Sequence, residues 1–524
     1  MFETLSILPV SFWVVILLLL GGAVWSFQHL SGGTGLPLLA VLGTTAAWYV
    51  GDAIYNDYAH NHRLLFSSAI LDGAWWEVAW FLVVLLVSVP VVHRLINARY
   101  LNRRSGVLTL FAHGVNQPII QRQLNLMFGT CATVWIILLV IAALVLKGQV
   151  IYFLFPFLGY KPNPWGHGQI GAGFDCFSIV ALYLQLLTAT MFGVVAALAM
   201  NRGVRRAAIV LCLLAWPWFV FDRVRNLILA LVIPTVLSWV FLRFRGQLWK
   251  KVLILSLLFC VFNVWMKFVI ANRSHESIVQ AFSQKGLDLA ETKNAHNEGL
   301  NMYEELCWIN DFIDKGTYRV NWGARYFAEL VNPIPRALWP GKPLIGLDYA
   351  VARGHKMNEV THTVDTTIAT GMIGQGVVNF GRLLGPAAAA VLMSLWVAWL
   401  ARLDLNVHAL GRLPLYAMGL ILTFNLGRDI TLITLYPFVF GSLAVWWLDR
   451  NQPSRPNPSR RRMNRSNSPA GLPPKASGQA WAGYRPPFRP NEARPIRPAP
   501  PRRPPNGGPG FSSQRPWPRG RTPK

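Results

Sequence analysis

The chain has 524 residues, of which 53% are hydrophobic and only 14% are charged, and its formal net charge is +26. Soluble domains contain roughly 25% charged residues, so this composition excludes a soluble globular protein and predicts an integral membrane protein. The positive charge alone would suggest a nucleic-acid partner. Because most of it lies in a C-terminal tail and in loops, we expect no nucleic-acid binding.

Eleven apolar runs are long enough to cross the roughly 30 Å hydrocarbon core of a bilayer. They predict an all-α, polytopic transmembrane bundle of about eleven spans, although the sixth and seventh runs could instead form one re-entrant pair. The first run has no basic residue before it and reads as a span rather than a signal peptide. The runs lie near residues 6–27, 35–54, 74–95, 126–146, 174–199, 207–222, 226–243, 250–270, 380–401, 413–427 and 430–449.

Every second connection between these runs is basic. The basic residues follow the third, fifth, seventh and ninth runs: Arg94, Arg99, Arg103, Arg104, Arg122, Arg202, Arg205, Arg206, Arg243, Arg245, Lys250, Lys251, Arg402 and Arg412. Since basic loops are retained in the cytoplasm, the N-terminus is predicted outside and the C-terminus in the cytoplasm. The predicted organisation is eight spans in 1–270, a large outward-facing loop subdomain in 271–379, and three spans in 380–450.

The tail from 451 to 524 has a different composition. It holds 19 of the 35 prolines and 16 basic residues against one acid, Glu492. So few aliphatic residues cannot offset the entropy of ordering a chain, so disorder is predicted. A cationic cytoplasmic tail would also adhere to anionic lipid head groups.

The large loop contains the stretch "NPIPRALWPGKP", residues 332–343. Its prolines exclude a regular helix. Helical spacing of apolar residues predicts a helix before it, ended by Gly316, and a second helix over 323–331. After it, "GMIGQG" has the spacing of a nucleotide-binding loop, but no strand precedes it. Gly371, Gly374 and Gly376 therefore predict a tight re-entrant turn or a close helix contact.

Charges at membrane depth are functional candidates because burying them is costly. Three places qualify, all predicted on the outer side: "DRVRN" with Asp222, Arg223 and Arg225, "GRD" with Arg428 and Asp429, and the 332–343 stretch with Arg336 and Lys342. Arginine forks suit phosphate oxygens, so these cations could converge on a lipid-linked diphosphate. The alternative is that Asp222 pairs with Arg225 and Asp429 with Arg428, and that the stretch is only a kinked structural loop.

The loop also offers possible bases: Glu304, Glu305, Asp311, Asp314, His362 and Asp365. Each is more often a solvated surface group than a catalytic one. "HNH", residues 60–62, lacks a third ligand, so no metal is expected. The five cysteines have no metal-ligand spacing. No serine-elbow, Walker or zincin pattern occurs.

The stretch "PRALWPGKP" followed by "GQGVVNFG" and then "GRD" resembles the O-antigen polymerase (Wzy-type) family. Pro335, Arg336, Leu338, Trp339, Pro340, Lys342 and Pro343 match the first motif, and Gly376, Asn379, Phe380 and Gly381 match the second. Gln375 departs from the family pattern, where an acidic residue is common. The resemblance covers roughly residues 75–450.

The resemblance implies a GT-C-like glycosyltransferase of the bacterial inner membrane, without a metal or cofactor. It would polymerise undecaprenyl-diphosphate-linked repeat units on the periplasmic face, with a chain-length regulator as a further partner. The candidate roles of individual residues rest on this resemblance together with the charge pattern. They are Arg336, Arg223, Arg428, Arg225 and Lys342 for the diphosphate, Asp429, His362 and Asp365 for the base, and Trp339 for a sugar or the membrane interface.

Three other functions remain open. An O-antigen ligase-like enzyme would use the same donor with a different acceptor. A transporter or lipid flippase would show internal repeats, and none is seen in the sequence. A non-catalytic subunit of an envelope assembly is the third.

Overall fold

The computed structural model describes residues 8–55, 62–113, 117–158, 163–166, 175–221, 225–244, 246–271, 301–343, 345–355, 368–409 and 411–451. Every regular element in these ranges is a helix, which confirms the all-α prediction. All of the predicted tail except Asn451 lies outside the described residues.

Each of the eleven predicted runs coincides with one long helix. In chain order they are α2 (Val10–Gln28), α3 (Gly35–Thr45), α6 (Ser68–Asn97), α8 (Pro118–Val145), α10 (Asp175–Leu198), α11 (Arg202–Val220), α12 (Arg225–Leu237), α13 (Leu248–Ala271), α18 (Gly371–Asp404), α19 (Arg412–Arg428) and α20 (Leu432–Asn451). π-Helical segments extend α3 and α12: η2 (Ala46–Val50) and η5 (Ser238–Arg243).

Seven helical stretches of the described chain are long and apolar enough to cross a membrane, by length and composition. They are Val10–Gln28, Gly35–Ile54, Ser68–Tyr100, Pro118–Val145, Phe177–Leu198, Arg202–Val220 and Gly371–Asp404. The apolar stretches Leu227–Arg243 and Leu435–Trp447 are shorter. The chain is therefore consistent with a multi-pass membrane protein, and the count of eleven spans stays a prediction.

Short helices occupy the connections. They are α4 (Gly51–Tyr55), α5 (His62–Leu65), α7 (Gly106–His113), α9 (Val150–Leu154), α15 (Met302–Asp314), α16 (Ala324–Val331) and α17 (Leu347–Ala352). In the large loop, α15 ends just before Gly316, whose φ of 70° gives the left-handed residue that closes a helix. The described helices α15 and α16 are the two that the spacing predicts.

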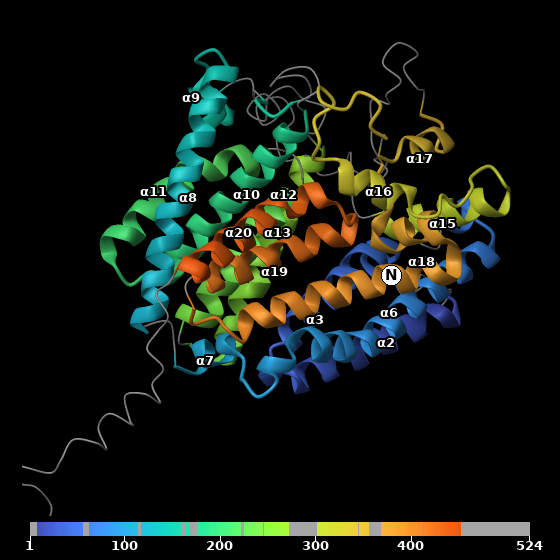
Figure 1. Ribbon diagram of the computed structural model, residues 1–524, viewed down its shortest axis with the longest axis horizontal. Helices are drawn as coiled ribbons and strands as arrows, with labels where there is room; N and C mark the ends of the chain where they lie inside the picture. The colour runs from blue at the N-terminus through green and yellow to red at the C-terminus, as the bar shows by residue number, and fades with distance from the viewer. Residues whose placement is uncertain are drawn as a thin grey trace, which may run out of the picture. The chain divides into compact units, whose positions relative to one another are not determined.

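The helices pack around two hydrophobic clusters. One joins α2, α3, α6, α15 and the first part of α18, with Trp75 and Tyr303 among its fully buried rings. The other joins α8, α10, α11, α12, α19 and α20 around Phe192 and Phe219. Trp396 and Leu435 contact both clusters. In Figure 1, α18 accordingly lies between the α2–α3–α6 group and the α19–α20 pair.

The ninth predicted run starts at 380, but α18 begins at Gly371 and breaks at Gly381. Gly381 has φ 78° and ψ 179°, a backbone conformation that glycine adopts freely and other residues avoid. The nine residues before Phe380 are all buried. The break therefore separates a short buried helix, residues 371–380, from the long helix that ends at Asp404.

The two parts of α18 fold against each other at two glycines. A Cβ on Gly376 would lie 2.2 Å from the carbonyl oxygen of Gly385, and a Cβ on Gly385 would lie 2.4 Å from the Gly376 carbonyl. Similarly, a Cβ on Gly374 would lie 2.8 Å from Cδ1 of Ile309. These are the close helix contacts that the glycine spacing predicts. Only glycine allows backbones to approach this closely.

The basic connections meet at one end of the bundle. Arg103 hydrogen-bonds to Asn406, which joins the connections after α6 and α18. Met200, after α10, accepts a hydrogen bond from Arg243 and donates one to Gln121 at 2.9 Å. Figure 1 shows α7 at this end of α18, and α15 and α16 at the other. In a chain that crosses a membrane repeatedly, every second connection must lie at the same end, as the basic connections do here. The compartment that each end faces stays a prediction.

Candidate functional site

A buried arginine and an aspartate meet at the end of the bundle opposite the basic connections. Arg325 lies in the first turn of α16 and is 4% exposed. Its Nη2 is 3.7 Å from Oδ1 of Asp429, which follows the last residue of α19. The alternative from the sequence paired Asp429 with Arg428, whereas the ion pair in the structure is with Arg325. Arg428 is the exposed neighbour whose charge also acts on Asp429.

The short buried part of α18 holds α16 in place. The backbone N–H of Tyr326 donates to Oδ1 of Asn379 at 3.3 Å, and the Asn379 side chain donates to the carbonyl of Gln375 at 2.7 Å. The N–H of Asn321 donates to the carbonyl of Val378 at 3.1 Å. The asparagine of the "NFG" motif therefore fixes the helix that carries Arg325.

The same buried part also fixes the backbone around Asp429. Thr370 donates to Asp429 Oδ1 from both its N–H, at 3.4 Å, and its hydroxyl, at 3.1 Å. The Gln375 side chain accepts from the Ile430 N–H at 2.9 Å and donates to the Ile430 carbonyl at 3.3 Å. An amide donates and accepts at the same time, which an ionised carboxylate cannot do. This pairing gives a physical reason for glutamine where the family resemblance leads one to expect an acid.

Part of the Arg325 guanidinium has no partner among the described residues. Its Nε and Nη1 are buried without a hydrogen bond, and the nearby hydroxyl of Tyr326 is in the same condition. A buried donor without an acceptor costs about 1–3 kcal/mol, and more if it is charged. Gly346, at φ 64°, packs against the guanidinium: a Cβ on Gly346 would be 3.5 Å from Nη2 of Arg325. The arginine is thus held in place by packing while its donors remain available.

Burial raises the pKa of Asp429 above its ordinary value, and the charges of Arg325 and Arg428 oppose that rise. Burial likewise raises the pKa of the Tyr326 phenol. A carboxyl group with an elevated pKa accepts a proton more readily near neutral pH than an ordinary aspartate does. The centre therefore combines two cations with a carboxylate suited to proton transfer.

Arg336 and Lys342, the cations predicted in the 332–343 stretch, contact the stretch itself. Lys342 is 6% exposed, and its Nζ donates to the carbonyls of Asn332 at 2.7 Å and Ile334 at 2.8 Å. Arg336 donates to the carbonyls of Pro340 at 3.3 Å and Pro343 at 3.4 Å. Prolines leave carbonyls with few N–H partners, and the two cations supply the missing donors.

The other predicted residues are placed as follows. Trp339 is 37% exposed at the surface of the stretch. Arg225 is the first residue of α12. Arg223, His362 and Asp365 lie outside the described residues, so their roles stay predictions. Among the described residues, no group of three histidine, cysteine or acidic side chains could hold a metal ion.

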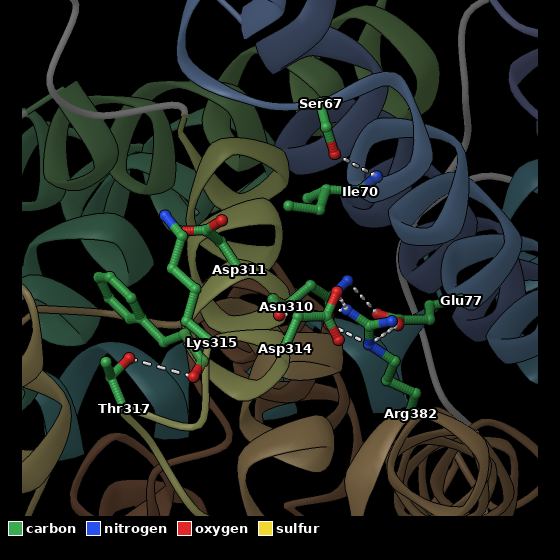
Figure 2. Close-up of polar contacts among 10 residues, drawn as sticks. Ser67, Ile70, Glu77, Asn310, Asp311, Asp314, Lys315, Thr317 and Arg382 are labelled. Carbon is green, nitrogen blue, oxygen red and sulfur yellow. Dashed lines mark hydrogen bonds and ion pairs between the residues drawn. The ribbon is translucent and has the colours of Figure 1, made fainter.

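The loop acids that the structure describes, Glu304, Glu305, Asp311 and Asp314, have partners. Figure 2 shows Arg382, just after the α18 break, between Glu77 of α6 and Asp314 of α15. Its Nε is 3.5 Å from Glu77 and its Nη2 is 2.9 Å from Asp314. Asn310 donates to Glu77 at 3.1 Å and accepts from Arg382 at the same distance. This network braces α15 against α6 and the break.

Glu305 forms a second structural network in α15. It is 1% exposed, accepts a hydrogen bond from the Tyr349 hydroxyl, and lies 3.1 Å from Nη2 of Arg353. The Arg353 guanidinium in turn stacks 4.5 Å from the centre of the Trp308 ring. Asp311 pairs with Lys315 on the same helix. These contacts give the acids of α15 structural partners within α15, in α17 and just after α17.

Arg325 was missed in the sequence because "GARYFAEL" resembles an ordinary amphipathic surface helix. The available signal was its place between a glycine and the proline-rich stretch, in a chain where charges are scarce.

Together, the helices and this polar centre define the class: an all-helical protein with several apolar helices of membrane-spanning length. No protein-family model, curated protein or solved structure matches the chain.

Proposed function

We propose that the chain is a membrane glycosyltransferase that polymerises oligosaccharide repeat units linked to a lipid diphosphate. The observation that carries the proposal is the buried Arg325, which lies next to Asp429 and Arg428 and whose Nε and Nη1 have no hydrogen-bond partner in the described part of the chain. Guanidinium donors suit diphosphate oxygens. The motif resemblance to O-antigen polymerases adds the substrate class: an undecaprenyl-diphosphate-linked glycan at the periplasmic face of the inner membrane.

The reaction follows from this assignment. A hydroxyl of the acceptor sugar attacks the anomeric carbon of the donor glycan, and the bond from that carbon to the diphosphate oxygen breaks. The diphosphate leaves with the bonding electrons, and Arg325 and Arg428 stabilise the charge that develops on it. Asp429 accepts the hydroxyl proton. Arg336, the first candidate from sequence, would act less directly, since its fork is bonded to loop carbonyls.

The test uses membranes of a strain that lacks the protein and accumulates the lipid-linked repeat unit. Purified protein is added, and polymer length is followed on gels. Removal of one charge-stabilising donor lowers turnover about 10²–10³-fold, so Arg325→Ala should abolish polymer. Arg325→Lys should recover little of it, because lysine keeps the charge but loses the fork.

Arg319→Ala is the matched control, since Arg319 is an exposed arginine a few residues before α16. It should polymerise normally. Polymer of normal length from Arg325→Ala, with the protein present in normal amount, would refute the assignment. Supplying the lipid A core as a second acceptor in the same assay separates a polymerase from a ligase.

A further inference from the structure

An apolar groove lies on α11, next to the second hydrophobic cluster. It has a volume of about 460 Å³ and lies between α10, α11 and the α12–η5 helix. Ile209, Leu213, Trp216 and Val220 of α11 line it, together with Ala197 of α10 and Trp239 of η5. α10 and α11 belong to stretches long and apolar enough to cross a membrane, and Leu227–Arg243 is a shorter apolar stretch.

The walls of the groove present hydrocarbon. Its few polar groups are already bonded within the protein: Trp216 Nε1 donates to the Ala189 carbonyl at 3.0 Å, and the Thr235 hydroxyl donates to the Leu231 carbonyl at 3.3 Å. Gly193 forms the floor, because a Cβ there would be 2.1 Å from the Thr235 hydroxyl. The lining of the groove therefore suits a hydrocarbon chain better than a polar ligand.

One end of the groove is cationic. Arg205 precedes Ile209 by four residues, so both lie on the same face of α11. Arg243 is one turn beyond Trp239, and it contacts Met200 at the end of the bundle where the basic connections meet. Among the described residues, no ion pair joins either arginine to a carboxylate. Each cation is thus about one turn beyond a lining residue, Arg205 from Ile209 and Arg243 from Trp239, at the level where a lipid head group would be.

The length of the groove indicates what occupies it. Ile209 and Val220 are separated by about 16 Å along α11 at 1.5 Å per residue. One leaflet of hydrocarbon is about 15 Å thick, half of the bilayer core. An acyl chain that reaches from the interface to the bilayer centre matches this distance. A polyprenyl chain is several times longer.

We infer that the groove binds an anionic phospholipid, with one acyl chain along α11 and its phosphate between Arg205 and Arg243. This site is separate from the proposed reaction centre and does not depend on it. Bound lipid would fill the space between α10, α11 and α12, and would couple the position of these helices to the anionic lipid content of the leaflet on the basic side.

The experiment measures phospholipid retained by the purified full chain. Protein in neutral detergent is incubated with dioleoyl phosphatidylglycerol or dioleoyl phosphatidylcholine, and bound lipid is counted by native mass spectrometry. One phosphatidylglycerol should bind, and more tightly than phosphatidylcholine. Each cation contributes about five-fold to affinity for an anionic head group. The double variant Arg205→Gln, Arg243→Gln should therefore lose about thirty-fold for phosphatidylglycerol, and less for phosphatidylcholine, because its choline offsets the charge of its phosphate.

Arg206→Gln is the charge-matched control, because Arg206 is exposed and lies on a different face of α11. Ala197→Trp should fill the groove and displace the lipid. Val210→Trp, an exposed position outside the groove, should not. Equal affinity for the two lipids, no effect of the double arginine variant, or displacement by an equimolar polyprenyl phosphate would each overturn the assignment.

Discussion

The close approach of Gly376 to Gly385 gives a quantitative test of the fold around the proposed site. A Cβ at Gly376 would lie 2.2 Å from the Gly385 carbonyl oxygen. The obstacle is backbone on the other part of the same helix, so no side-chain rotation relieves it. Overpacking of this kind costs typically 1–3 kcal/mol, and more when backbone must move. The helix-propensity gain of alanine over glycine is only about 1 kcal/mol.

Gly376→Ala is therefore expected to destabilise the protein by at least about 2 kcal/mol and to displace Gln375 and Asn379. Gly73→Ala is the matched control, because Gly73 lies within α6 and a Cβ there meets nothing within 4 Å. It should be neutral or stabilising by up to about 1 kcal/mol. The readout is the apparent unfolding temperature in detergent at a fixed scan rate, which allows for irreversible unfolding. Equal unfolding temperatures for the two variants would refute the described packing of α18.

Two further predictions concern residues 301–355. Lys342→Met should leave the carbonyls of Asn332 and Ile334 without a donor, at about 1–3 kcal/mol, and limited proteolysis should cut the 332–343 stretch faster. Lys315→Met, which removes an exposed intrahelical pair, should not change the cleavage rate. Burial raises the pKa of Glu305 above its ordinary value of 4.5, so the folded state holds this proton more tightly than the unfolded state. Stability from this group is present below pH 4.5 and is lost as the pH rises through the folded pKa. Glu305→Gln should therefore weaken the dependence of the unfolding temperature on pH between pH 4.5 and the folded-state pKa of Glu305. An unchanged pH dependence in this variant would contradict the assignment.

The helices were predictable because membrane spans depend on local apolar composition, which needs no knowledge of tertiary contacts. All eleven runs correspond to helices, and the glycine spacing indicated close packing. The start of α18 was placed too late because Gln375 and Asn379 made residues 371–380 read as loop. Besides a bond within the helix, their polar groups are bonded to Ile430 and Tyr326, which are distant in sequence.

The candidate site was only partly predictable. Asp429 and Arg428 follow from the rarity of charge near the membrane. The partner of Asp429 does not, because Arg325 reaches it only through the folding of α16 onto α18. The residue types alone do not distinguish whether Arg336 and Lys342 bind a ligand or the carbonyls of a proline-rich loop. In the structure their described contacts are with the loop.

The break of α18 at Gly381 also has an electrical consequence. A helix carries roughly half a positive charge at its N-terminus, and the short buried part of α18 places such an end at Gly371, next to Thr370 and Asp429. This part of the potential comes from the peptide backbone. Substitution of Arg325 or Arg428 does not remove it, so such variants should retain a weak affinity for anions at the centre.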